Sequence, residues 1–128
     1  MAPMGALRID RLTGPPAPLR DADGRPLAAR CYAARSVRAR LVGLMATRDL
    51  ARDEALWLEP CGSVHAFGLR APIGCAFLDA DGTVLRVVDP LPRWRAARAR
   101  GARAVVECRA GVLSGVAVGT RLARDGPG

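Results

Sequence analysis

The sequence contains no lysine: all 20 basic residues are arginine, and with 12 acidic residues they leave a formal charge of +8. Arginine without lysine, beside abundant alanine, glycine and proline, is the composition that a GC-rich coding sequence produces without selection for binding. A high positive charge affects solubility and non-specific attraction more than it specifies a function. The charge alone therefore does not predict a nucleic-acid-binding or membrane-binding protein.

Aromatic residues and long apolar runs are also scarce. Only Tyr32, Trp57, Phe67, Phe77 and Trp94 are aromatic, so the core must be built mainly from leucine, valine and alanine. No stretch approaches the roughly 18 apolar residues of a transmembrane helix, and residues 1–30 hold no apolar run of the signal-peptide kind. We therefore expect a cytoplasmic protein with no membrane span, and the sequence does not indicate its oligomeric state.

The four cysteines form no CxxC pair, and in the cytoplasm they would be reduced thiols. Cys61, His65 and Cys75 carry donor atoms that suit zinc. However, three residues separate the first two and nine separate His65 from Cys75, which is unlike the close ligand pairs of structural zinc modules. Cys75 and Cys108 lie in apolar runs, where cysteine behaves as a small hydrophobic residue. We predict no metal and no other cofactor.

Short apolar runs separated by glycine, proline and aspartate predict a mainly β protein. We expect strands at 6–12, 26–34, 55–60 and 104–108, and a strand or extended segment at 63–69. The clearest signal is at 73–90, where two β-rich runs flank the hairpin sequence Asp79-Ala80-Asp81-Gly82. The same four residue types at 21–24 predict a second tight turn. Residues 91–103 read as a basic loop or short helix.

Helical spacing is seen at one place, where Ser36 can cap a segment that carries Val37, Leu41 and Leu44. No alternation of strands and helices and no glycine-rich phosphate loop is present, which argues against a nucleotide-binding α/β fold. We predict a single antiparallel β-sandwich or barrel, similar to a jelly roll, with one short helix near residues 36–45. Residues 1–26 would form an N-terminal edge strand and turn, 27–122 one β-rich domain, and 123–128 a disordered tail.

Several blocks, in order, resemble a known family: "RARLVGLMATRDLARDEALWL", "CGSVHAFGLRAPIGCAFLDADGTVLRV", "LPRWR", "AVVECRAG" and "VAVGTRL". Together they are similar to the bacterial and archaeal domain of unknown function 192 family, over roughly residues 27–122. The resemblance implies a compact β-rich domain related in shape to jelly-roll sandwiches. It implies no reaction, because no biochemical activity is established for that family.

The resemblance can be carried over residue by residue. Gly43, Leu44 and Met45 match a Gly-Leu-Met block, which implies packing of a helix end against the sheet. His65, Phe67, Gly68, Leu69 and Arg70 match a block that in many members reads Val-His-Thr-Phe-Gly-Met-Arg-Phe-Pro-Ile-Asp. Here Ala66, Leu69, Ala71 and Gly74 replace threonine, methionine, phenylalanine and aspartate. The missing carboxylate at position 74 implies that any acid/base machinery is incomplete, or that the site is looser.

Polar residues in these blocks suggest a binding surface. His65, Arg70, Trp94 and Arg95, with Glu107 in support, could form a pocket in which guanidinium groups bind an anion and the indole stacks on a ring. The ligand would be a small anionic or sugar-like, polyhydroxylated molecule, or an acidic segment of a partner protein. The structural alternative is that Arg70 and Glu107 form an ion pair between strands while Trp94 covers one end of the core.

Two other functions remain open. A hydrolase or lyase could use His65 as its general acid/base, which requires a second titratable group or a metal within hydrogen-bond reach. Cys61 is a poor nucleophile partner for His65, because on an extended segment the two would lie about 13 Å apart. The arginines at 93, 95, 98, 100 and 103 could contact the phosphates of a nucleic acid, but only Trp94 is available for base stacking. We therefore favour a non-enzymatic binding module and consider nucleic acid an improbable partner.

Overall fold

The computed structural model describes residues 15–34, 50–65, 72–92 and 94–125. Within these ranges the chain forms strands and turns and no helix, so none is present there that could cross a membrane. The strands are β1 (Ala17–Asp21), β2 (Pro26–Ala34), β3 (Glu54–Leu58), β4 (Ser63–His65), β5 (Ile73–Leu78), β6 (Val84–Leu91), β7 (Ala96–Arg98), β8 (Ala104–Arg109) and β9 (Leu122–Arg124). The mainly β prediction is confirmed, whereas the helix predicted near 36–45 lies outside the described residues.

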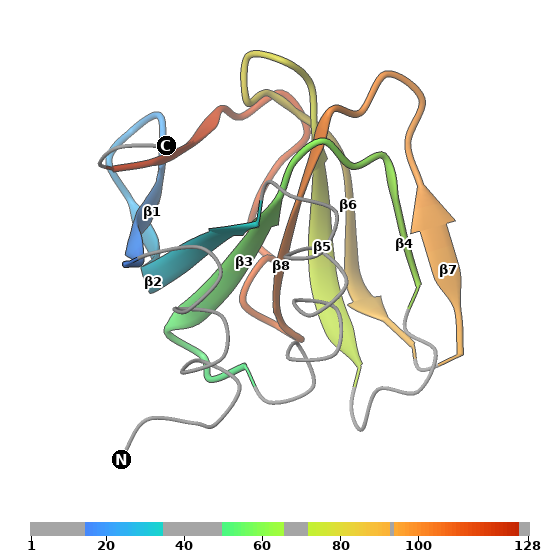
Figure 1. The fold of residues 1–128 in the computed structure, drawn as a ribbon, viewed down its shortest axis with the longest axis horizontal. Helices are drawn as coiled ribbons and strands as arrows, with labels where there is room; N and C mark the ends of the chain where they lie inside the picture. Colours follow the sequence, from blue (N-terminus) through green and yellow to red (C-terminus); the bar gives the residue numbers. More distant parts are fainter. Residues whose placement is uncertain (1–14, 35–49, 66–71, 93, 126–128) are drawn as a thin grey trace.

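Seven strands form one sheet in the order β6-β5-β8-β3-β2-β1-β9, and β4 pairs with β7 in a separate small sheet. Figure 1 shows the small sheet to the right of the β5–β6 end of the large one. The prediction of an antiparallel sandwich or barrel is confirmed only as far as the mainly β class, because the large sheet is mixed and not closed. The strands β2 and β3 pair in parallel, and β6 and β9 remain as two open edges of the sheet. The long connection over residues 35–53 permits this parallel pairing, which a short turn could not.

The hairpin predicted at 73–90 is confirmed, because β5 and β6 pair antiparallel around the turn at 79–82. The carboxylate of Asp79 accepts hydrogen bonds from the backbone N–H groups of Asp81 and Thr83. In the turn between β1 and β2, the carboxylate of Asp21 accepts from the N–H groups of Asp23 and Arg25 in the same way. Both Asp-Ala-Asp-Gly turns therefore use one mechanism, in which an aspartate side chain replaces backbone partners.

The segment predicted as a basic loop or short helix at 91–103 contains the strand β7. Within it Ala97 is buried while Ala96 and Arg98 are exposed, which is strand alternation over three residues. The strand β1 was also missed, because Pro15, Pro16 and Pro18 suggest a breaker and prolines are disfavoured in strands. The strand expected at 6–12 lies outside the described residues.

The large sheet buries apolar side chains on both faces, since alternate residues of its strands join two different clusters. We call the first the front cluster: it combines Leu56, Cys75, Phe77 and Val105 of the large sheet with Val64 and Ala97 of the small sheet. The second, the back cluster, combines the alternate residues of the same strands with Leu19, Leu113 and Leu122. Each face of the sheet therefore has its own covering layer, and the small sheet covers part of the front face.

Candidate functional site: a basic groove and a buried carboxyl group

The small sheet and the edge strand β6 enclose a groove of about 340 Å³, lined by Ser63, Val64, Arg86, Ala96, Ala97 and Arg98. Val64 and Ala97 are the inward residues of β4 and β7, so they give the groove an apolar floor. Ser63 and the two arginines are exposed. The volume is within the range of small-molecule sites, and the described residues that line the groove include no acidic one. These side chains suit an anionic group with some apolar bulk.

Arg86 is positioned for this role by its strand. It lies opposite Phe77 in the β5–β6 ladder, and its Nη1 donates a hydrogen bond of 2.7 Å to the backbone carbonyl oxygen of Arg98. This contact joins β6 to the end of β7 and holds the guanidinium at the groove. A guanidinium has five N–H donors in a planar fork, so one such bond leaves other donors for a ligand.

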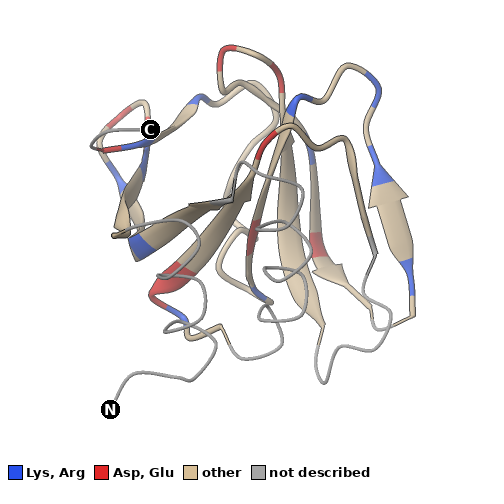
Figure 2. Cartoon of the chain, viewed as in Figure 1, with Lys and Arg blue, Asp and Glu red and all other residues tan. Residues whose placement is uncertain are grey.

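The charges on this side of the molecule are unevenly distributed. Figure 2 shows basic residues on β6, on β7 and along the loop that follows β7, and acidic residues at other turns, on β3 and β8, and at the end of β6, which contains Asp89. The exposed arginines of this side are Arg86, Arg95, Arg98, Arg100 and Arg103. A surface with one sign of charge attracts counter-ions and speeds the association of anionic ligands.

Trp94 lies two residues before the groove, in the turn that connects β6 to β7. The backbone N–H of Arg95 donates to the carbonyl oxygen of Pro92, and Trp94 occupies the third position of this turn with φ of 68°. The side chain of Trp94 is 63% exposed, and Arg95 beside it is exposed as well. Trp94 and Arg95 therefore directly precede the groove-lining residues of β7 in the chain.

Glu107 occupies a different environment, in the middle of the large sheet. It is fully buried in β8, in register with Leu56 of β3 and Cys75 of β5, and within the described structure neither carboxyl oxygen has a hydrogen-bond partner. Burial raises the pKa of Glu107 to about 8, because an apolar environment disfavours the charged form. Burial also raises the pKa of Cys75 to about 12, and the negative charge of Glu107 adds to that shift. Glu107 is thus mainly neutral at pH 7.

A second buried carboxyl group, that of Glu54 in β3, has partners. It accepts a hydrogen bond of 2.9 Å from the N–H of Ala51, a longer one of 3.5 Å from the Tyr32 hydroxyl, and lies 3.7 Å from Arg30. Arg30 also bonds to the carboxylate of Asp53. Hydrogen-bond partners therefore offset the cost of burying the Glu54 carboxyl group, whereas the described residues provide no such partner for Glu107.

Position 74, where the sequence lacks an expected carboxylate, is filled from a neighbouring strand. A Cβ atom at Gly74 would lie 2.6 Å from the carboxylate of Asp89 in β6. That carboxylate accepts hydrogen bonds from the N–H groups of Gly111 (2.7 Å) and Leu113 (2.8 Å). A carboxylate is thus present near position 74, where it holds the turn after β8.

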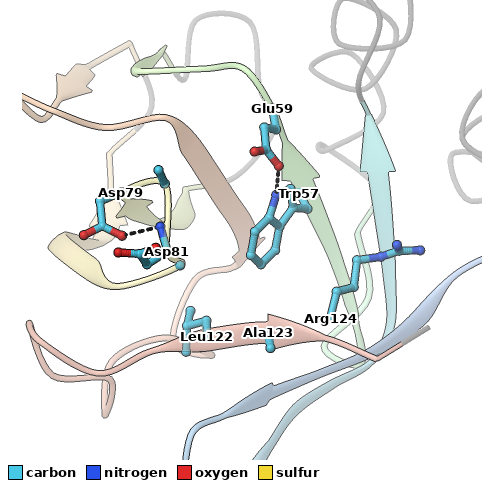
Figure 3. Close-up of a pocket in the computed structure, with 9 residues that line it drawn as sticks. Trp57, Glu59, Asp79, Asp81, Leu122, Ala123 and Arg124 are labelled. Carbon is cyan, nitrogen blue, oxygen red and sulfur yellow. Dashed lines mark hydrogen bonds between the residues drawn. The ribbon is translucent and has the colours of Figure 1, made fainter. Parts of the chain in front are cut away.

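Another pocket, of about 250 Å³, lies at the opposite side of the large sheet and is shown in Figure 3. Two of its acidic side chains are engaged in local contacts: Glu59 accepts from the Trp57 indole N–H at 3.0 Å, and Asp79 closes its own turn. Arg124 at its edge donates to the carbonyl oxygen of Cys31. These contacts give Glu59, Asp79 and Arg124 structural roles.

The sequence of residues 19–123 matches the profile of DUF192, a family described as "Uncharacterized ACR". The chain belongs to the DUF192 family. No functionally curated protein matches it.

Solved structures share the fold of this DUF192 domain. A protein of Sinorhizobium meliloti described as a putative transcription regulator is 23% identical with a TM-score of 0.71, covering 86% of this chain and 92% of its own. A protein of unknown function from Novosphingobium aromaticivorans is 20% identical with a TM-score of 0.70, covering 96% of this chain and 93% of its own. At these identities the likeness shows the fold alone.

The predicted site residues of the DUF192 domain are brought together only in part. His65 ends β4, and its backbone pairs with Ala96, directly after Trp94 and Arg95. Glu107 does not line the groove, and Arg70 lies outside the described residues. Sequence reasoning missed Ser63 and Arg86 as groove residues, since nothing in the local pattern of β6 indicates that Arg86 reaches the end of β7.

Proposed function

We propose that this DUF192 domain is a binding module whose ligand places an anionic group in the groove between β4, β6 and β7. The observation that carries the proposal is that Arg86 and Arg98 both line the groove, and that none of the described residues that line it is acidic. Arginine binds carboxylate and phosphate through two parallel N–H···O bonds, and these charge-assisted bonds are stronger than neutral ones. Ser63 adds a hydroxyl that can donate to the same anion or to a hydroxyl group of a sugar.

A screen by isothermal titration calorimetry with phosphates, carboxylates and sugars tests the proposal. We expect Arg86→Gln and Arg98→Gln each to weaken binding of a responding anion by about tenfold or more, since a hydrogen bond to a charged group contributes roughly 1.5–3 kcal/mol. Arg121→Gln is the matched control, because it removes the same charge from an exposed arginine that does not line the groove. Arg70→Ala tests whether the site extends beyond the described residues.

Two results would count against the proposal. One is that the wild-type protein responds to none of these compounds. The other is that Arg121→Gln weakens binding as much as the groove variants do, because binding would then reflect only the overall charge of +8. Weak binding that disappears as salt is added, and that is equal in the three variants, would likewise show that only the overall charge attracts the anion.

An acid/base enzyme is the second candidate, and the pKa of Glu107 at about 8 favours it, since catalytic acids are often buried groups with shifted pKa values. The groove geometry supports it less, because Glu107 is fully buried and does not line the groove. Hydrolysis of nitrophenyl esters and phosphates, compared between the wild type, Glu107→Gln and His65→Ala, tests this candidate. Equal background rates in all three would exclude a role for either residue in those reactions.

A further inference from the structure

The strand β7 has an open edge, because among the described strands it pairs with β4 alone. The backbone N–H of Ala99 donates to the carbonyl oxygen of Gly62, one position beyond the paired residues Ser63 and Arg98. In an antiparallel ladder, pairs that exchange hydrogen bonds alternate with pairs that do not. Arg98 therefore belongs to a pair without such bonds, and so does Ala96, two residues earlier. The N–H and C=O groups of both residues point away from β4.

This open edge lies on the side of the groove. The carbonyl oxygen of Arg98, which points away from β4, accepts the hydrogen bond from Nη1 of Arg86 in β6. The outward side of β7 is thus the side that faces β6. Ala96 and Arg98 are exposed, and the described residues provide no other hydrogen bond to their outward backbone groups. Such groups on an exposed edge strand can pair with another extended segment.

The charge of this surface indicates which segment fits. Arg86 and Arg98 line the groove beside the open edge, and Arg95, Arg100 and Arg103 are exposed on the same side. None of the described residues that line the groove is acidic. A second copy of this chain would also carry a formal charge of +8, so charge favours an acidic segment of a different protein.

The alternation of β7 predicts the residue pattern of that segment. Ala97 packs with Val64 in the front cluster, whereas Ala96 and Arg98 are exposed on the other face of the strand. The side chains of a strand added beside β7 would alternate in the same way. Residues level with Arg98 would be acidic, since opposite charges on neighbouring strands attract, and residues level with Ala97 would be apolar.

We propose that the open edge of β7 binds an extended acidic segment of a partner protein as an added strand. This inference rests on the proposed function, to which it adds the class of partner and the pairing of its backbone. Backbone hydrogen bonds to Ala96 and Arg98 supply affinity, and the arginines that line the groove select an acidic sequence. The carbonyl oxygen of Arg98 has two lone pairs, so it can accept from the segment and from Arg86 together.

Calorimetric titration with the capped synthetic peptide Glu-Val-Glu-Val-Glu-Val tests the inference. We expect it to bind about tenfold more tightly than the same peptide with glutamine in place of glutamate. Two further peptides carry N-methyl groups, one on its glutamates and the other on its valines. An antiparallel segment directs the glutamate N–H groups to β7, and a parallel one directs the valine N–H groups there. One methylated peptide should therefore bind about tenfold more weakly than the other.

A change in the protein tests the same hydrogen bonds from the other side. Ala96→Pro removes an outward N–H at the first residue of β7, a position where strands accept proline. Ala96→Val keeps this N–H and is the matched control. The peptide should bind about fivefold more weakly to Ala96→Pro than to the wild type, and Ala96→Val should bind it as the wild type does.

Hydrogen exchange of the wild type, followed by NMR, gives a readout that needs no variant. With the peptide bound, the N–H groups of Ala96 and Arg98 should exchange about tenfold more slowly, because they enter a ladder of hydrogen bonds. The N–H of Ala97 points towards β4 in the free protein, so its exchange should change little and serves as the internal control.

The outcomes separate this inference from the proposed function. Equal binding of the two methylated peptides, with unchanged exchange at Ala96 and Arg98, would overturn the added strand and leave anion binding in the groove intact. Tighter binding of an oligothymidylate with three phosphates than of the peptide would also overturn it, as would a wild type that binds phosphate and no peptide. A wild type that binds neither the peptides nor any anion of the calorimetric screen would overturn both.

Discussion

The carboxylate of Asp89 lies where a side chain at position 74 would begin, with its Cγ and Oδ2 atoms 2.6 Å from the place of a Cβ on Gly74. Real Cβ atoms do not approach other atoms so closely, so Gly74 and Asp89 are coupled. The aspartate uses this space to accept two backbone N–H groups of the turn after β8. Its carboxylate is thus near the position at which the resemblance had indicated that one was missing.

This coupling predicts a non-additive pair of substitutions. Gly74→Ala should lower the free energy of unfolding by about 1–3 kcal/mol through overpacking. Asp89→Ala should lower it by about the same amount, since it leaves two N–H groups without their acceptor. In Gly74→Asp/Asp89→Ala the new carboxylate can take over these N–H groups, so the double variant should be more stable than the sum of the single effects by about 0.5–3 kcal/mol. Urea unfolding gives the free energy of unfolding of the wild type, the two single variants and the double variant. Additive changes in this free energy would refute the coupling.

The two Asp-Ala-Asp-Gly turns offer a matched pair of glycine substitutions. Gly24 and Gly82 have φ of 83° and 84°, but a Cβ at Gly24 meets nothing within 4 Å, whereas one at Gly82 would lie 2.6 Å from the carbonyl oxygen of Leu122. Gly24→Ala should therefore cost about 1 kcal/mol, the effect of the positive φ alone. Gly82→Ala should cost clearly more, because it also pushes β9 away. Equal changes in thermal or urea unfolding would contradict the close approach.

Glu107 predicts a pH-dependent stability. Its pKa rises from 4.5 to about 8 on folding, so the folded state binds more protons between these values. The contribution of Glu107 to the free energy of unfolding should be highest below pH 4.5, fall by up to about 1.4 kcal/mol per pH unit towards pH 8, and level off above it. Glu107→Gln cannot titrate and serves as the control. The difference in free energy of unfolding between the wild type and Glu107→Gln, measured by urea unfolding at several pH values, should fall with this slope. A difference that does not change with pH would argue against the buried carboxyl group.

Cysteine reactivity provides a test of burial. Cys31, Cys75 and Cys108 are fully buried, and burial raises the pKa of each thiol, to about 12 for the first two. Since the thiolate is the reactive form, iodoacetamide at pH 8 should modify the partly exposed Cys61 first. The other three should react only after unfolding in urea. Mass spectrometry of peptides at increasing times distinguishes this order from equal labelling of all four.

Local sequence determined the elements whose hydrogen bonds are made between near neighbours. The aspartates of the two tight turns bond to N–H groups two and four residues further along, and the hairpin between β5 and β6 follows from one of these turns. Short apolar runs identified β2, β3 and β8, since a strand whose two faces are both covered reads as a nearly continuous apolar run. These features depend on short-range sterics and hydrogen bonding, which a sequence displays directly.

Only the tertiary structure decided which strands are neighbours and which side chains meet. The parallel pairing of β2 with β3, the contact of Arg86 with the end of β7, and the carboxylate of Asp89 above Gly74 all join residues that lie apart in the chain. The burial of Glu107 is likewise set by β3 and β5 on its two sides. Such contacts depend on how the sheet is assembled, because packing and desolvation are properties of the whole fold. For this reason the sequence could suggest single polar residues for a binding surface, whereas only the structure shows that Arg86 and Arg98 line one groove.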